Sequence, residues 1–457
     1  MKRKLVLSVS LAVLLLDGCG IYTSYQRPES VPADSLYRDV PVTAGDSSSL
    51  ATLSWRELFT DPRLREWVEL GLEKNTDLRT ARLKVEEAEA ALLSSRLAFL
   101  PSVSLTPQGT LSRYGSGTSS KTYSLGASAE WEADVFGGLR NAKRGARASL
   151  EQSKAYEQAV QTQLVATIAE TYCSLLMLDR QLAITRQTVV NWEENVRMMR
   201  VLKRAGQADE AAVAQAEADR LSAEASALAL ERQIHELENS FSTLVGIVPQ
   251  EIKRGELSGL TFPADLSVGV PLQLLDRRPD VRQAEQVLAQ AFYVTNEARS
   301  AFYPKITLSG AAGWTNSGGT AITNPGKWLL SAVGSLVQPV FNRGKNVAQL
   351  KIAKAQQEEA LLAFQQKLLD AGAEVNNALT QWQTAQKCLA IDKQRIEKLE
   401  AAVRSTTLLM RYGDTNYLEV LTAQQTLLQA RLSEVSDKYD EIQGIIQLYH
   451  ALGGGTD

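Results

Sequence analysis

The stretch AFYPKITLSG at Ala301–Gly310 decides the fold, because a close copy, AFLPSVSLTP, stands 203 residues earlier at Ala98–Pro107. Each stretch ends a long helical pattern and opens a run in which apolar and polar residues alternate. Such alternation is typical of a strand with two different faces. The chain is therefore expected to make the same helix-to-strand turn twice.

The two turns belong to an internal repeat, which organises most of the chain. Its matching pairs are Asp77–Ala81 with Asp280–Ala284, Val135-Phe136 with Val340-Phe341, Arg204-x-Gly206 with Arg411-x-Gly413, and Leu244–Gly246 with Ala451–Gly453. The offset grows only from 203 to 207 residues along the chain. We expect two copies of one unit, at 61–248 and 272–454, joined by a linker at 249–271.

Each copy has the order helix, strand hairpin, very long helix, turn, helix. The predicted bounds are hairpin 102–132, long helix 139–204 and helix 208–246 in the first copy, and 305–340, 344–411 and 416–452 in the second. At 1.5 Å per residue each long helix would measure about 100 Å. The first carries a heptad seam that includes Ile168, Leu175 and Leu182, which indicates coiled-coil packing and, alone, only a structural rod.

The hairpins carry the second structural signal. Val103, Leu105 and Leu111 share one parity, with Ser and Thr on the other. The returning strand of the second hairpin, which starts near Trp328, alternates less cleanly. Four strands cannot close a membrane barrel, since the smallest barrels have about eight. The strands therefore belong either to an ordinary soluble hairpin or to a barrel completed by further copies of this chain.

Residues 1–18 have the pattern of an export signal, and 19–60 is an N-terminal segment. Lys2, Arg3 and Lys4 precede an apolar stretch that is too short to span a bilayer permanently. Cys19 follows directly and resembles the lipidated cysteine of bacterial lipoproteins, although Asp17 stands where a small neutral residue is usual. The alternative is a plain secretory signal with an incidental cysteine.

Composition and spacing exclude several classes of function. The net charge of −3 leaves no electrostatic footprint for nucleic acid. The cysteines after the signal, Cys173 and Cys388, are too far apart for a disulfide framework or a zinc site, and neither His235 nor His450 has a partner at metal-ligand spacing. No nucleophile elbow, phosphate loop or redox cysteine pair is present. We therefore expect no enzyme, metal or cofactor.

Five separated motifs together resemble the TolC-like outer-membrane efflux channels, in the lipoprotein branch typified by OprM and NodT. They are SWRELFTDPRLREWVELGLEKNTDLRTA, SAEWEADVFGGLRNA, LLDRRPDVRQAE, FYPKITLSGAAGW and RYGDTNYLEVLTAQQTLLQARL. The resemblance implies a mixed α+β homotrimer, in which twelve strands form one barrel in the outer-membrane lipid and twelve helices form a periplasmic tunnel. It also implies a passive duct that receives substrates from an inner-membrane pump through a periplasmic adaptor, and a lipid anchor at Cys19.

The same resemblance implies functional residues at the periplasmic tips. Counted from Gly413, Leu418 corresponds to a constricting leucine and Glu419 to an acid, whereas Thr422 replaces a constricting aspartate of the family. The charge at the gate would then rest on Glu419 and Asp414; the alternative is that Glu419 is an ordinary solvated residue. The tips that would contact the adaptor carry Gly206, Asp209, Glu210 and Gly413.

Two other functions remain open at this point. The exit channel of a protein-secretion system would share the same duct. A soluble periplasmic coiled-coil scaffold would share the helical hairpins, but it would not need two strand hairpins that each open at a matched proline. The cargo and the partner pump cannot be read from the residues.

Overall fold

The computed structural model describes residues 22–28, 53–113, 115, 120–260, 262, 277–317, 327–412 and 417–455. The chain divides into two compact units, and each unit draws on both halves of the sequence. Unit 1 comprises Met1–Ser30, Leu83–Ala155 and Arg282–Gln366, and unit 2 comprises Val31–Arg82, Tyr156–Val281 and Lys367–Asp457.

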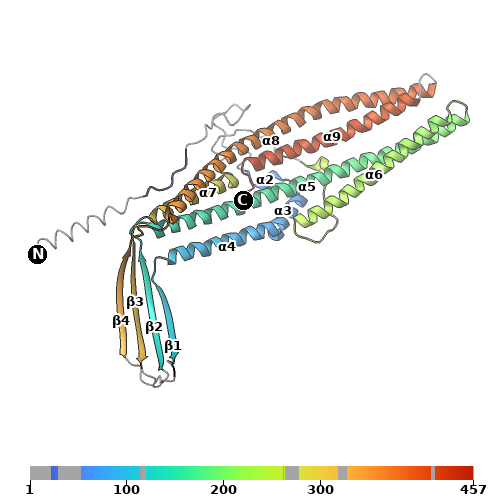
Figure 1. Cartoon of the computed structure of the whole chain (residues 1–457). Coiled ribbons are helices and arrows are strands. Elements are labelled where there is room, and N and C mark those ends of the chain that lie inside the picture. The colour runs from blue at the N-terminus through green and yellow to red at the C-terminus, as the bar shows by residue number, and fades with distance from the viewer. Residues whose placement is uncertain are drawn as a thin grey trace. The chain divides into compact units, whose positions relative to one another are not determined.

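The described elements alternate between helices and strand pairs along the chain (Figure 1). In order they are α2 (Trp55–Leu58), α3 (Pro62–Lys74), α4 (Thr76–Leu97), β1 (Ser102–Ser112), β2 (Ser120–Ala133), α5 (Gly138–Arg204), α6 (Glu210–Leu244), the short η4 (Leu257–Gly259), α7 (Pro279–Ser300), β3 (Lys305–Ser317), β4 (Lys327–Val337), α8 (Lys345–Tyr412) and α9 (Tyr417–Ala451). Within the described ranges, no helix combines the length and the apolar character needed to cross a membrane.

Two of the helices are unusually long. The α5 helix has 67 residues and α8 has 68, which corresponds to about 100 Å each. Neither contains a proline, so nothing removes a backbone hydrogen bond along their length. The heptad seam of α5 is buried: Ile168, Leu175 and Leu182 all enter the main hydrophobic cluster of unit 2.

The strands of unit 1 form one antiparallel sheet in the order β1-β2-β3-β4 (Figure 1). The two hairpins lie side by side, because β2 of the first pairs with β3 of the second, for example at Leu125 opposite Trp314. Each outer strand, β1 and β4, has a single neighbour among the described strands. The sheet therefore ends in two edges with free hydrogen-bonding groups.

The register gives this sheet one face that is apolar apart from Lys121 and Asn316 near the loop ends of β2 and β3, and we call its apolar members the apolar sheet face. Its members are Val103, Leu105, Pro107, Gly109 and Leu111 of β1, Tyr123, Leu125, Ala127, Ala129, Trp131 and Ala133 of β2, Ile306, Leu308, Gly310, Ala312 and Trp314 of β3, and Leu330, Ala332, Gly334 and Leu336 of β4. The face is not covered within the chain, since Leu105 is 74% and Leu330 is 84% exposed.

The opposite face is mainly polar. It carries Ser104 and Thr106 of β1 and Ser124 and Ser128 of β2. On β4, however, Val333 and Val337 fall on this face, because they have the opposite parity to Leu330 and Leu336. These valines are the reason that the alternation of this strand is hard to read from the sequence.

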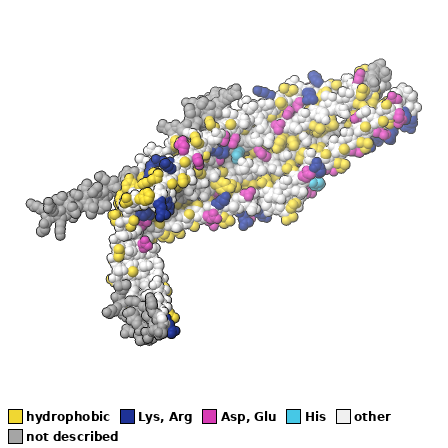
Figure 2. All heavy atoms as spheres, viewed as in Figure 1, with side chains coloured by type: hydrophobic (Ala, Val, Ile, Leu, Met, Phe, Trp, Pro, Cys, Tyr) yellow, Lys and Arg dark blue, Asp and Glu magenta, His cyan; other side chains and the backbone are white. Residues whose placement is uncertain are grey.

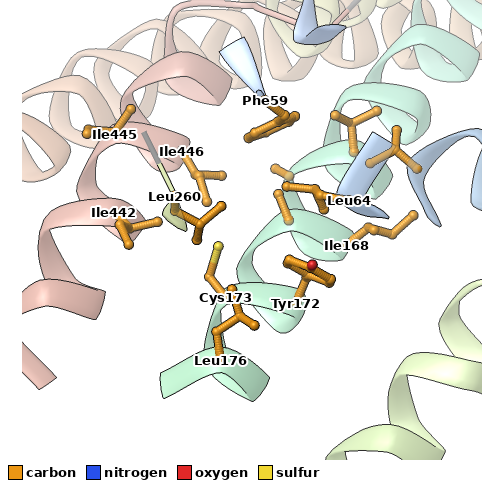
Figure 3. Packing of buried hydrophobic residues seen from close by; sticks show 14 of the residues in the cluster. Phe59, Leu64, Ile168, Tyr172, Cys173, Leu176, Leu260, Ile442, Ile445 and Ile446 are labelled. Atoms are coloured by element: carbon orange, nitrogen blue, oxygen red, sulfur yellow. The ribbon is translucent and has the colours of Figure 1, made fainter. Parts of the chain in front are cut away.

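Unit 2 is held by a large hydrophobic core. The core gathers α2 and α3, the middle of α5, the segment after α6 and the end of α9. Figure 3 shows how Phe59 and Leu64 meet Ile168 and Tyr172 of α5, with Ile446 of α9 close by. Residues almost 400 positions apart thus share one core, which ties the N-terminal helices to the C-terminal helix.

Several buried polar groups inside unit 2 are paired. The Tyr172 hydroxyl donates to Asp61 Oδ2 at 2.7 Å and accepts from the Gly255 N–H at 3.0 Å. Arg278 is almost fully buried, and its guanidinium donates to both carboxylate oxygens of Asp280 at 3.0 and 2.7 Å. Burial would raise the pKa of Asp280, but hydrogen bonds and charges from Arg278 and Lys367 outweigh it and hold that pKa well below its usual range.

Candidate functional site

The turn between α5 and α6 forms one tip of unit 2. The Gln207 N–H donates to Leu202 O at 2.9 Å and the Gly206 N–H donates to Lys203 O at 3.0 Å, which is the pair of bonds that defines a Schellman motif. Gly206 has φ +74°, a conformation that costs little only without a Cβ atom. This requirement explains the glycine at the turn.

The acids of this turn have structural roles. Asp209 is the N-cap of α6, and its Oδ1 accepts from the Ala212 N–H at 2.8 Å. Glu210 forms an ion pair with Lys203 across the turn. Both side chains remain at the surface, so their use by an adaptor stays a prediction. The other residues proposed for the tips, Gly413 and Asp414, lie outside the described residues, as does Cys19.

The first turn of α9 has a buried side that packs on the α5–α6 hairpin. Two small hydrophobic clusters form this contact. The first contains Val196, Met199, Val213 and Ala216, with Met410 and Tyr417 packed against it. The second contains Trp192, Ala223 and Leu421, again with Tyr417. Tyr417 is the residue that belongs to both clusters, and it therefore connects the two helical hairpins.

The predicted gate residues lie on the other side of α9. Leu418 is 61% exposed, and Glu419 and Thr422 are also exposed. The Thr422 hydroxyl donates to Leu418 O at 2.9 Å, one helical turn back, so its proton is engaged by the backbone of its own helix. The structure thus brings Leu418, Glu419 and Thr422 together on one surface and leaves that surface open.

Polar contacts reinforce the packing of α9 on the α5–α6 hairpin. Asn195 Nδ2 donates to Gln424 Oε1 at 2.6 Å, and Gln425 Nε2 donates to Asp219 Oδ1 at 3.4 Å. The Tyr417 hydroxyl is buried and has no hydrogen-bond partner within the described residues. Burial, with a smaller contribution from the charge of Asp219, raises the pKa of Tyr417 well above its usual range, so this side chain stays neutral.

This arrangement can act as a joint at which the start of α9 moves relative to the α5–α6 hairpin. At the tip, the contact between the first turns of α9 and the α5–α6 hairpin uses few polar bonds and two small clusters, whereas the main core of unit 2 is extensive. Sequence reasoning identified the exposed residues of this joint and missed Tyr417 and Asp219. The available signal for Tyr417 was an aromatic residue directly before Leu418, but this signal does not indicate which helix the ring packs against.

The described residues contain no group of three or more His, Cys, Asp or Glu side chains placed to hold a metal ion. Cys173 is buried and Cys388 is partly exposed, and both are free thiols. Within these ranges the tip contact, rather than a reactive centre, is the candidate site.

The sequence and the fold are both similar to those of known proteins. A family described as outer membrane efflux protein matches residues 67–247 and 270–454. The cation efflux system protein CusC of Escherichia coli O157:H7 is 29% identical over 451 residues, with 97% of each chain covered. The probable outer membrane lipoprotein SilC of Salmonella typhimurium is 28% identical, with 98% of each chain covered.

A solved structure shows the same fold. The outer-membrane channel OprN superimposes with a TM-score of 0.87 at 27% identity, and the match covers 96% of this chain and 100% of that one. The two matched family segments also fall on the two halves of the chain that carry the matching Ala-Phe-x-Pro turns.

Proposed function

The chain belongs to the outer membrane efflux protein family and is an efflux exit duct, and from this premise we propose how it is assembled. Three copies join their sheets edge to edge, β1 of one against β4 of the next, and close a twelve-stranded barrel. The two halves of each chain are repeats of one unit, and twelve helices, four from each copy, form a tunnel on the periplasmic side.

The apolar sheet face carries this proposal. Apart from Lys121 near the loop end of β2, no charged residue shares this face on the four strands, and the face is exposed, whereas the opposite face is mainly polar. Such a sheet suits the wall of a membrane barrel, in which the apolar face contacts lipid and the polar face contacts the water inside. The two free edges can be satisfied in a bilayer only by further strands, which a second and a third copy supply.

The position of the N-terminal segment supports a lipid anchor near the end of the sheet that adjoins the helices. Tyr22 lies against Gly137, where β2 passes into α5, since a Cβ atom built on that glycine would meet the tyrosine ring at 3.4 Å. Tyr25 packs edge-on against Phe292 of α7, with ring centroids 5.8 Å apart. Cys19 is three residues from Tyr22, which is at most about 11 Å of chain. Acyl chains on Cys19 would therefore reach a membrane entered by the sheet.

We assign the tips to gating and docking. Leu418 and Glu419 of three copies would face the axis, while the α5–α6 turn with Gly206, Asp209 and Glu210 would meet a periplasmic adaptor that links the duct to an inner-membrane pump. Relatives named for cation efflux favour small cargo over secreted proteins. The chain would be passive, and its partners would supply the energy.

A pair of variants on neighbouring residues tests the barrel. Leu105→Arg places a charge on the apolar sheet face, where it would cost about 2–4 kcal/mol near the bilayer centre. Thr106→Arg is the matched control, because it places the same charge on the polar face of the same strand. We expect Leu105→Arg to reduce the folded trimer in outer-membrane fractions severalfold and Thr106→Arg to leave it near the parent level. Equal behaviour of the two variants would contradict a membrane-embedded sheet.

A further inference from the structure

A cluster of cations lines a cleft in unit 1 that the efflux function does not use. The cleft lies between the end of α4 and the start of α5 and has a volume of about 480 Å³. Its lining consists of Arg96, Phe99, Arg140, Lys143, Arg144 and Arg147. We call it the basic cleft. Five of its six lining residues are positively charged, and none is acidic.

The cations are set on one face of α5 by their spacing. Arg140, Lys143, Arg144 and Arg147 follow the i, i+3, i+4, i+7 pattern, which aligns side chains along a helix. Arg140 pairs with Asp134, at 3.1 Å between Nε and Oδ2. Within the described ranges, no acidic partner is found for Arg96, Lys143, Arg144 or Arg147. Four of the five cations of the cleft thus keep their charge without a described acidic partner, which favours an anionic ligand.

The position of the cleft in unit 1 indicates what kind of anion it would bind. Phe99 stands three residues before β1, and its carbonyl oxygen accepts from the indole N–H of Trp131 at 2.9 Å. Trp131 is the last aromatic residue of the apolar sheet face on β2. Lys143 Nζ lies 5.6 Å from the centre of the Phe99 ring, within the range of a cation–π contact. The basic cleft therefore begins where the apolar sheet face ends.

Aromatic side chains gather at this same junction. Phe136 stacks on Tyr303 with centroids 5.1 Å apart, and Phe341 is 85% exposed. Figure 2 shows hydrophobic and basic side chains together where the strands meet the helices. Tryptophan and tyrosine rings favour the boundary between acyl chains and headgroups. Cations just beyond such a boundary lie at the depth of lipid phosphates.

We propose that the basic cleft binds the phosphate of an anionic phospholipid in the leaflet that faces the helices. Arginine donors match phosphate oxygens in charge and geometry, and Phe99 offers an apolar contact for the first carbons of the acyl chains. This inference rests on the proposed insertion of the apolar sheet face into a membrane. It adds a specific lipid site that would fix the depth of the barrel.

The test uses the full-length protein reconstituted in vesicles of phosphatidylcholine or phosphatidylglycerol with brominated acyl chains. Bromine quenches the tryptophans of the apolar sheet face, Trp131 beside the cleft among them. We expect the protein to prefer phosphatidylglycerol severalfold in mixed vesicles. Each arginine near an anionic surface is worth roughly fivefold, so Arg144→Gln/Arg147→Gln should abolish this preference, and Arg144→Lys/Arg147→Lys should retain most of it.

The matched control is Arg180→Gln/Arg197→Gln, which removes two exposed arginines of the same helix far along the chain from the cleft and should keep the parental preference. Quenching by neither lipid would mean that the sheet does not insert, which overturns the proposed function. Equal quenching by both lipids in the parent, or an unchanged preference in the glutamine variant, would overturn the lipid site alone. So would loss of the preference in inorganic phosphate at an ionic strength where chloride preserves it, because the cleft would then be a site for free phosphate.

Discussion

At the first turn of α9, neighbouring residues have opposite environments. Tyr417 packs inward on the α5–α6 hairpin, whereas Leu418 faces outward. Tyr417→Ala would remove a ring shared by two clusters, and truncation of a buried aromatic residue costs about 3–5 kcal/mol. We expect faster amide hydrogen exchange in the first turns of α9, together with a higher resting conductance.

Tyr417→Phe separates the ring from its hydroxyl. Because the hydroxyl is buried without a hydrogen-bond partner in the described structure, its removal should be neutral or stabilising by up to about 1 kcal/mol. Exchange in α9 should then match the parent. If the phenylalanine variant exchanged as fast as the alanine variant, the hydroxyl would have to make a bond in the assembled protein.

The gate residues allow a separate test, since width and charge are assigned to different side chains. Leu418→Ser should widen the constriction and raise the conductance in planar bilayers. Glu419→Gln should keep the conductance but reduce the preference for cations, and this effect should shrink at high salt, where screening is stronger. Leu408→Ser, at an exposed leucine of α8, is the control for the loss of surface leucine. Parental conductance and selectivity in both gate variants would place the constriction elsewhere.

Only part of this site could be predicted from the sequence, because some of its contacts join different helices. Counting from Gly413 identifies residues on one helix, and Leu418, Glu419 and Thr422 share an exposed face there, whereas their role as a gate stays a prediction. The contact of Tyr417 with the cluster near Asp219 joins residues about 200 positions apart. Such a contact depends on how two helices are rotated about their axes, which one sequence does not specify.

At the scale of elements, the α5–α6 turn depends on its cap. Asp209→Ala removes the acceptor for the Ala212 N–H and should destabilise the start of α6 by about 1 kcal/mol. Asp209→Asn keeps a capping oxygen and should restore most of this stability while removing the charge. Hydrogen exchange of the first turn of α6 measures the cap, and binding of the cognate adaptor measures the charge.

These two variants separate structure from recognition. If adaptor binding falls in both variants, the charge of Asp209 contributes to docking. If it falls only in the alanine variant, the acid acts through the shape of the turn. Normal binding and normal exchange in the alanine variant would show that the cap is dispensable.

The bounds of the two long helices and the two strand hairpins could be predicted from the sequence, whereas the pairing of one hairpin with the other could not. The pattern predicts long helices at 139–204 and 344–411, and the structure has them at Gly138–Arg204 and Lys345–Tyr412, because proline-free heptads and Gly turns mark such ends locally. The first helical pattern is divided into α3 and α4 at Asn75, whose side chain donates to Leu244 O at 2.8 Å. Asn75 also caps α4, because its Oδ1 accepts from the Leu78 N–H at 2.9 Å, so the break combines a local capping signal with a tertiary contact.

At the scale of the whole molecule, each compact unit combines both halves of the sequence. The sheet in unit 1 pairs a hairpin from each half, and the core of unit 2 joins α3 and α5 to α9. Neither half can complete its own sheet or core. The repeat visible in the sequence therefore describes how the chain is built, while the folded units are shared between the two copies.

The anchor is the last property at this scale, and its prediction follows from the docked N-terminal segment. Arg27 forms an ion pair with Glu285 of α7 at 3.9 Å, and its guanidinium lies over the Phe364 ring of α8 at 5.5 Å. These contacts hold the segment on unit 1 only a few residues after Cys19.

Intact-mass measurement of the membrane-extracted protein should show that the mature chain begins at Cys19 with a diacylglyceryl-sized addition. Because the apolar sheet face provides insertion independently, Cys19→Ser should reduce the amount sorted to the outer membrane more than the conductance of each inserted channel. An unmodified mature chain that begins elsewhere would remove the anchor and leave the channel standing, whereas loss of conductance per channel in the serine variant would show that the lipid also shapes the pore.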